Sequence, residues 1–186
     1  MTVSLTINGI AVKAEPGMTV LEAAKAAGIY IPTLCYHPKL TSVGACRLCI
    51  VDIDNMRGFS TACTVPVSEA MVVRTETEPI QSLRREILSL ILSEHPYTCL
   101  VCARRSDCDD FQGTVRKAAV TTGCQYCPEN GQCDIPKLVD YLDLRDIPYP
   151  ISYRGLPVEQ NDPFFDRDYN LCVLCGRCVR VCQDVR

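Results

Sequence analysis

The fourteen cysteines among 186 residues are the side chains of this sequence best suited to chemistry, and their spacing indicates which chemistry. Most are separated by only two, three or five residues. A tight turn between two cysteines points both sulfurs the same way, so this spacing favours shared metal centres over disulfides. The first residues, Met-Thr-Val-Ser-Leu-Thr-Ile-Asn-Gly, lack the basic and apolar regions of a secretory signal, which also argues against a disulfide framework.

The first cysteine group has intervals of ten, two and thirteen residues. Its members are Cys35, Cys46, Cys49 and Cys63. Four thiolates suit a [2Fe–2S] cluster, and three from one loop plus one from a later turn is similar to plant-type ferredoxins, with a longer first interval. Gly44 is expected to let the backbone approach the sulfides closely. A structural zinc site is the alternative. His37 is expected to pack or hydrogen-bond within the loop, with metal ligation as its alternative role.

The second group combines one imidazole with three thiolates. Its members are His95, Cys99, Cys102 and Cys108. This set can hold a [4Fe–4S] cluster, and a neutral imidazole in place of a thiolate should raise the reduction potential. The alternative is that His95 only ends a helix in front of Pro96.

The third group repeats the cysteine spacing of the second, displaced by 25 residues, and comprises Cys124, Cys127 and Cys133. The position equivalent to His95 is Val120, which cannot bind a metal. This group is therefore expected to hold a [4Fe–4S] cluster with a distant fourth ligand, or alternatively zinc. Two such units are a duplicated metal loop and not a solenoid.

The fourth group has the spacing of a bacterial ferredoxin and comprises Cys172, Cys175, Cys178 and Cys182. The proline that usually follows is replaced by Gln183. Either Cys182 closes a single [4Fe–4S] cluster, or the motif belongs to a ferredoxin domain that continues in further sequence. Arg177 and Arg180 are expected to be solvated surface residues, with compensation of the cluster's negative charge as the alternative. Together the groups predict one [2Fe–2S] cluster and two or three [4Fe–4S] clusters.

The elements that position the first group are predicted within residues 1–76. Alternating apolar residues from Val3 to Ile7, an Asn8-Gly9 turn and a return strand indicate a hairpin. Thr19 to Glu22 is a capping box that begins a short helix, which ends at Gly28. Two more strands are expected at 48–53 and 71–75, which together suggest a β-grasp, ferredoxin-like [2Fe–2S] domain.

The rest of the chain is predicted to contain less regular structure. Residues 77–143 are expected to form a helix over 78–94 and a His/Cys3-type cluster-binding domain with the duplicated cysteine loop. The expected apolar stripe of that helix is Ile80, Leu83, Ile87, Leu90 and Ile91. Residues 144–171 are expected to be an extended, proline-rich linker, and 172–186 the start of a [4Fe–4S] ferredoxin domain. The predicted fold class is α+β.

Charge and motifs exclude several functions. The formal net charge is -3, which is unlike the basic footprint of a nucleic-acid-binding protein. No apolar run approaches the length needed to span a bilayer, so a cytoplasmic protein without direct membrane insertion is expected. Neither a Gly-rich dinucleotide motif nor a nucleophile–base arrangement is visible, so no catalytic residues are assigned.

Three cysteine-bearing segments in one order resemble a known family. They are Cys-Tyr-His-Pro-Lys-Leu through Gly-Ala-Cys-Arg-Leu-Cys (35–49), His-Pro-Tyr-Thr-Cys-Leu-Val-Cys (95–102), and Arg-Asp-Tyr-Asn-Leu-Cys through Cys-Val-Arg-Val-Cys (167–182). This order is similar to the N-terminal iron–sulfur module of the large iron–sulfur subunit of respiratory complex I. The same module occurs in [FeFe]-hydrogenases and NAD-dependent formate dehydrogenases.

The resemblance implies cluster ligation by the first two groups and by Cys172, Cys175 and Cys178. The triplet in the loop 109–133 departs from the usual pattern and leaves two candidates for pairing with His95. The function expected is electron relay between a flavin-containing subunit that oxidises NAD(P)H and a separate catalytic oxidoreductase subunit. The alternatives are a zinc-stabilised interaction scaffold, or the N-terminal part of a longer hydrogenase-type enzyme, so enzymatic activity is left open.

Overall fold

A computed structural model describes residues 2–104, 107, 123, 124, 127, 129 and 131–185. The chain divides into two compact units. The first unit comprises residues 1–87 and 175–186, and the second comprises residues 88–174.

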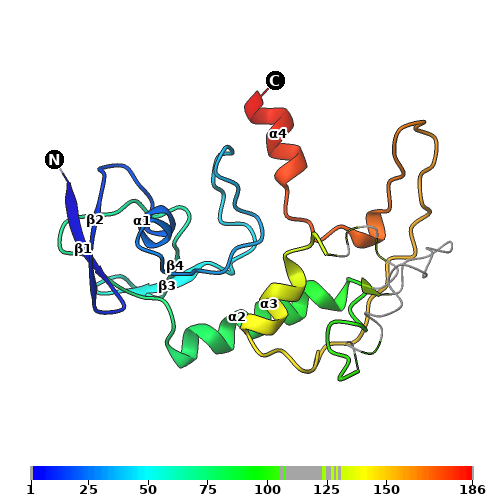
Figure 1. The fold of residues 1–186 in the computed structure, drawn as a ribbon, viewed down its shortest axis with the longest axis horizontal. Helices are drawn as coiled ribbons and strands as arrows, with labels where there is room; N and C mark the ends of the chain where they lie inside the picture. Colours follow the sequence, from blue (N-terminus) through cyan, green and yellow to red (C-terminus); the bar gives the residue numbers. More distant parts are fainter. Residues whose placement is uncertain are drawn as a thin grey trace. The chain divides into compact units, whose positions relative to one another are not determined.

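The first unit is built on a five-stranded mixed sheet (Figure 1). Its strands are β1 (Val3–Ile7), β2 (Ile10–Ala14), β3 (Ile50–Ile53), β4 (Phe59–Thr61) and β5 (Val72–Arg74). The strand order is β2-β1-β5-β3-β4, with β1 and β5 parallel and the other neighbours antiparallel. The sheet therefore places β1, near the beginning of the chain, beside β5, with Ile7 opposite Val73.

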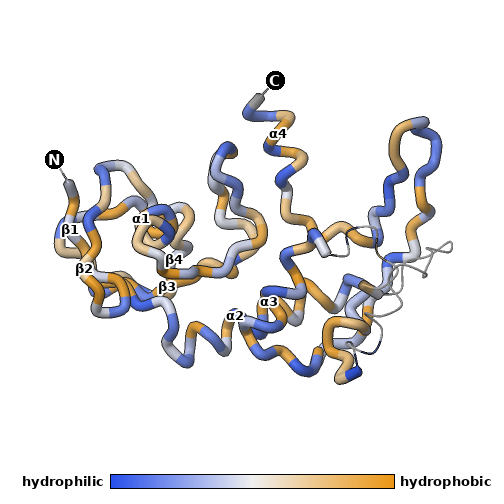
Figure 2. Tube along the Cα trace, in the orientation of Figure 1, coloured by the Kyte–Doolittle hydropathy of each residue, from blue (hydrophilic) through white to orange (hydrophobic). Residues whose placement is uncertain are grey.

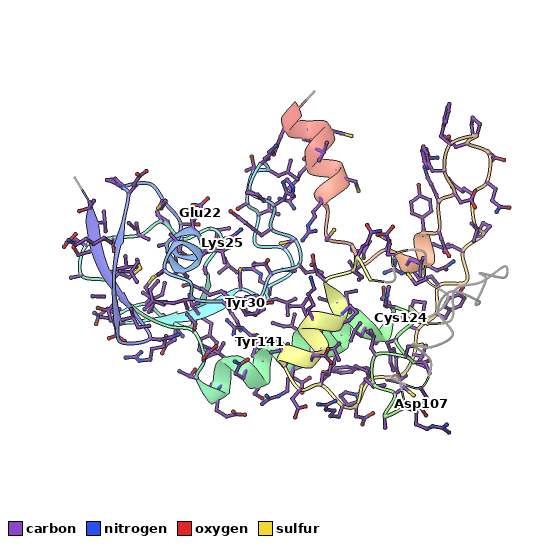
Figure 3. The ribbon with its side chains drawn as sticks, viewed as in Figure 1. Glu22, Lys25, Tyr30, Asp107, Cys124 and Tyr141 are labelled. Atoms are coloured by element: carbon purple, nitrogen blue, oxygen red, sulfur yellow. The ribbon has the colours of Figure 1, made fainter. Side chains whose placement is uncertain are left out.

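The hairpin and the first helix follow from local sequence. Asn8 and Gly9 both have positive φ, 52° and 79°, which the tight turn between β1 and β2 requires. The helix α1 (Val20–Ala26) begins at the predicted capping box, in which the Thr19 hydroxyl accepts from the Glu22 amide and the Glu22 carboxylate accepts from the Thr19 amide. Glu22 is labelled on this helix in Figure 3. These predictions are confirmed.

The core of the first unit lies between the sheet and α1. Side chains that alternate along the strands, such as Leu5 and Ile7, are buried together with Val20 and Ala24 from the helix. Hydrophobic and hydrophilic stretches accordingly interchange along the chain trace in Figure 2. The predicted α+β class is confirmed.

The long helix α2 (Glu78–Ser93) matches the predicted range, but its buried face differs from the predicted stripe. Leu83 and Leu90 are 39% and 53% exposed. Ile80 is buried as predicted, but the buried face continues through Arg84 and Leu88, at intervals of four residues. Hydrophobic periodicity placed part of the stripe wrongly, at Leu83 and Leu90, because an arginine occupies one of the buried positions.

The second unit contains more regular structure than the sequence indicated. A helix, α3 (Ile135–Tyr141), buries Ile135, Leu138 and Val139. A 3-10 helix, η3 (Tyr169–Leu171), lies just before Cys172, and Glu159 pairs with Arg167 through two backbone hydrogen bonds of 2.9 Å. The expected extended segment thus contains an ordered turn.

The last helix, α4 (Arg177–Val185), belongs to the first unit and was not predicted. It carries Cys178 and Cys182 at an interval of four residues, so both lie on one side of the helix. No helix in the described part of the chain is long and apolar enough to cross a membrane.

Candidate metal centres

The four cysteines of the first group come together in the structure as two pairs. Cys49 Sγ lies 3.3 Å from Cys63 Sγ, and Cys35 Sγ accepts from the Cys46 amide at 3.5 Å. Cys35, Cys49 and Cys63 are buried and Cys46 is half-buried. Two thiol pairs fit a two-iron cluster, because each iron takes two protein ligands.

The protonation of each pair reflects a shared proton. A hydrogen bond from the Cys46 thiol, opposed by burial, lowers the pKa of Cys35 to about 5, and the same bond raises the pKa of Cys46. Likewise the hydrogen bond between Cys49 and Cys63 raises the pKa of Cys49 and lowers that of Cys63. In each pair the pKa of one thiol is therefore lowered, which makes the thiolate, the form that binds iron, easier to reach.

The loop that presents these sulfurs has a demanding backbone. Arg47, between Cys46 and Cys49, has a positive φ of 58°, and Gly44 has a φ of 61°. A Cβ on Gly44 would lie 3.1 Å from Thr61 Oγ1, so this glycine is needed both for its conformation and for the close approach of strand β4.

His37 Nδ1 accepts from the Lys39 amide at 3.2 Å, which confirms its hydrogen-bonding role in the loop.

Two buried arginines that the sequence analysis did not place at the site hold the backbone around these cysteines. Arg84 of α2 is fully buried and donates to the carbonyls of Leu48 and Ile50, on either side of Cys49, at 3.0 and 2.8 Å. Arg180 of α4 is 5% exposed and donates to the carbonyls of Cys35 and Thr41. The expectation that Arg180 is a solvated surface residue is wrong, because α4 lies against the loop that begins at Cys35. No feature of the cysteine spacing indicated either arginine.

The second group is described only in part. His95 is half-buried just beyond α2, and its Nδ1 is a buried atom without a hydrogen-bond partner among the described residues. Burial and, to a lesser degree, the charge of Arg154 lower the pKa of His95 and favour the neutral imidazole. Cys99 is half-buried and Cys102 exposed, whereas Cys108 lies outside the described residues. A neutral imidazole with an unpartnered nitrogen fits a metal ligand.

The beginning of the third group lies close in space to Cys99 of the second group. A Cβ on Gly123 would lie 2.5 Å from Cys99 Sγ, so the Cys99 sulfur packs against the residue immediately before Cys124, which Figure 3 labels. Cys124, Cys127 and Cys133 are half-buried, and Cys133 Sγ accepts from the Ile135 amide at 3.5 Å. Val120 lies outside the described residues.

The fourth group is spread over a loop and a helix. Cys172 follows η3, and its carbonyl accepts from Arg154 at 3.1 Å. Cys175 precedes α4, and the exposed Cys178 and Cys182 lie on it. Positive φ values at Leu174 and Gly176, 53° and 66°, produce the sharp turns on either side of Cys175. Among the residues the structure describes, no three His, Cys, Asp or Glu side chains converge on a single point as for one ion.

Two segments of the chain match known protein families. Residues 1–78 match the family described as 2Fe-2S iron-sulfur cluster binding domain. Residues 84–112 match the family described as NADH-ubiquinone oxidoreductase-G iron-sulfur binding region. Domains of families that bind 2Fe–2S and 4Fe–4S clusters are therefore present in this order, as the sequence predicted.

Individual relatives carry the same resemblance over nearly the whole chain. The chain is 31% identical over 98% of its length to the mitochondrial NADH-ubiquinone oxidoreductase 78 kDa subunit of Candida albicans, and 30% identical over 98% to an NADP-reducing hydrogenase subunit of Solidesulfovibrio fructosivorans. It is also 30% identical over 97% to a putative formate dehydrogenase of Staphylococcus haemolyticus. It spans 22%, 28% and 16% of the length of these three relatives.

The fold of the chain is also similar to that of a chain in a solved hydrogenase structure. A chain in the crystal structure of an NAD+-reducing [NiFe]-hydrogenase in the H2-reduced state superimposes with a TM-score of 0.76 at 27% identity. The superposition covers 98% of this chain and 67% of the hydrogenase chain. The predicted resemblance to the iron–sulfur module shared by complex I, hydrogenases and formate dehydrogenases is confirmed.

Proposed function

We propose that this chain relays electrons between a flavin-containing subunit that oxidises NAD(P)H and a separate catalytic oxidoreductase subunit. The observation that carries the proposal is the pairing of four thiols in the first unit, Cys35 with Cys46 and Cys49 with Cys63. Two pairs are suited to a two-iron cluster. The similarity to subunits of NADH- and NADP-linked oxidoreductases supports a role in electron transfer. A location in the cytoplasm belongs to the same proposal.

The proposed clusters are assigned to different segments of the chain. Residues 1–76 would bind the [2Fe–2S] cluster, and 77–143 would bind a [4Fe–4S] cluster through His95, Cys99, Cys102 and Cys108, with the triplet Cys124, Cys127 and Cys133 as a further [4Fe–4S] or zinc site. Residues 144–171 would connect this domain to the fourth group, Cys172, Cys175, Cys178 and Cys182. This gives one [2Fe–2S] and two or three [4Fe–4S] clusters.

The protein's own contribution is to position and tune these sites. When bound, iron–sulfur clusters supply reversible one-electron transfer. Burial of Cys35, Cys49 and Cys63 would limit the access of water to the cluster. Arg84 and Arg180 hold the carbonyls around these cysteines, and neutral His95 would contribute a ligand without negative charge.

Elemental analysis of protein purified without oxygen tests the proposal. We expect iron and acid-labile sulfide well beyond the amount for a single [2Fe–2S] cluster. Zinc as the main metal would contradict the proposal and favour an interaction scaffold.

The isolated chain should not oxidise NADH with a dye acceptor. Such oxidation would show that it contains a nucleotide site of its own.

A further inference from the structure

The side chain of Arg180 reaches from α4 into the loop that holds the first cysteine group. It is 5% exposed, and its two terminal nitrogens donate to the carbonyl of Thr41, at 2.7 Å, and to that of Cys35. Both acceptors are neutral. Among the described residues no carboxylate forms an ion pair with Arg180. A positive charge is thus buried next to a cysteine, with no ion-pair partner in the described part of the chain.

A second contact anchors the same loop to the same helix. Asp184, one helical turn after Arg180, accepts from the Thr41 amide at 2.7 Å. Thr41 is therefore held at both its carbonyl and its amide by side chains of α4. The position of Arg180 is fixed by a two-sided contact and not by one hydrogen bond alone.

One donor of Arg180 remains unused. Its Nε is buried and has no hydrogen-bond partner among the described residues. A buried N–H without an acceptor costs free energy, so such a group indicates a partner that is still to be bound.

We propose that Arg180 is a positioning residue that raises the reduction potential of a [2Fe–2S] cluster on Cys35, Cys46, Cys49 and Cys63. The inference rests on the proposed function. Reduction adds one electron, supplied by a low-potential reductant, and no bond is formed or broken. The added negative charge is stabilised by a guanidinium that lies in a poorly solvated site, whereas the oxidised cluster gains less from it.

The test is a potentiometric titration of the complete chain, followed by the EPR signal of the reduced [2Fe–2S] cluster. Arg180→Gln removes the charge but retains an amide that can donate to the carbonyls. We expect a lower midpoint potential with unchanged iron and sulfide content. A tenfold loss in the reduced-to-oxidised ratio at fixed potential corresponds to about 59 mV for one electron.

Two matched variants separate charge from anchoring. Arg57→Gln removes the same charge from an exposed position of the same unit and should leave the potential unchanged. Asp184→Ala removes the other anchor together with a negative charge, so the potential should not fall. An unchanged potential in Arg180→Gln, or an equal fall in Asp184→Ala, would overturn the proposal.

Loss of the cluster in Arg180→Gln would still allow a decision. Arg180→Lys retains the charge, so a cluster held at close to the wild-type potential would support the proposal, and loss of the cluster here as well would reject it. Wild-type protein is analysed for iron and sulfide first. Absence of a [2Fe–2S] signal there is a failure of the proposed function, and it is distinguishable from a failure specific to Arg180.

Discussion

The Sγ atoms of Cys49 and Cys63 lie 3.3 Å apart although the two residues are fourteen positions apart in sequence. Cys49 directly precedes β3 and Cys63 follows β4, and these strands pair in antiparallel register with Ile50 opposite Thr61. The hairpin therefore determines the separation of the two sulfurs before any metal binds. This relationship leads to the first prediction.

Replacing Cys63 with alanine should abolish the [2Fe–2S] EPR signal of the reduced protein, because one thiol pair is broken. The [4Fe–4S] signals should remain largely intact, since the predicted ligands of those clusters lie elsewhere in the chain. Ser68→Ala, an exposed substitution in the following turn, is the control and should retain every signal. Simultaneous loss of all signals in Cys63→Ala would contradict modular sites.

Replacing Gly44 with alanine should reduce occupancy of the first cluster. Two costs add here: a positive φ of 61° and a Cβ that would lie 3.1 Å from Thr61 Oγ1. Gly58→Ala has the first cost only, about 1 kcal/mol, because its φ is 74° but no atom lies within 4 Å of the new Cβ. Iron content per chain measures the difference.

The contact at Thr61 gives this second prediction its own check. Adding Thr61→Ala to Gly44→Ala should restore part of the cluster occupancy by removing the crowded hydroxyl. Equal occupancy in Gly44→Ala and Gly58→Ala would mean that the approach of β4 to the loop is unimportant.

His95→Cys should keep a [4Fe–4S] cluster but lower its reduction potential, because it adds a thiolate charge. His95→Ala should leave that cluster labile. The motivation is the buried Nδ1 of His95, which has no hydrogen-bond partner in the described part of the chain. Potential and iron content are the readouts. If neither variant changes them, His95 only ends the helix, and the triplet beginning at Cys124 becomes the main candidate for that cluster.

Replacing Arg84 with methionine should destabilise the first unit by about 3 kcal/mol, because it leaves two carbonyls without a charged donor. Arg85→Met is a neighbouring control that breaks only the surface ion pair with Glu78 and should cost within about 1 kcal/mol. Hydrogen exchange of the β3 amides measures both effects. Equal protection in the two variants would show that the carbonyl contacts of Arg84 contribute little.

Local patterns allowed much of the first unit to be predicted. The Thr19–Glu22 capping box, the Asn8-Gly9 turn and the alternation from Val3 to Ile7 each depend on residues close in sequence. The strand pairing of β1 with β5 was not predictable in this way, because it joins Thr6 to Val72 across the whole domain. Strand β4 was not predicted because its three residues include one apolar side chain, whereas the equally short β5 contains Val72 and Val73.

The residues of the candidate sites that the sequence did not predict are polar side chains packed in the interior. Arginine is usually exposed, so a pattern of apolar residues did not place Arg84 or Arg180 in the interior. Their acceptors are backbone carbonyls, which every residue has and no sequence motif marks. Helix α4 was missed because its cysteines and arginines conceal a helical period in a segment with few buried apolar residues.

The contact between α4 and the Cys35 loop also has a consequence for the order of events during biosynthesis. Arg180 and Cys35 are 145 positions apart, so all four thiols of the first group leave the ribosome long before α4 is synthesised. Iron inserted at that stage meets a loop without its anchors at Cys35 and Thr41. Until α4 is synthesised these contacts cannot form, so the nascent [2Fe–2S] site should exchange iron more readily than the finished one.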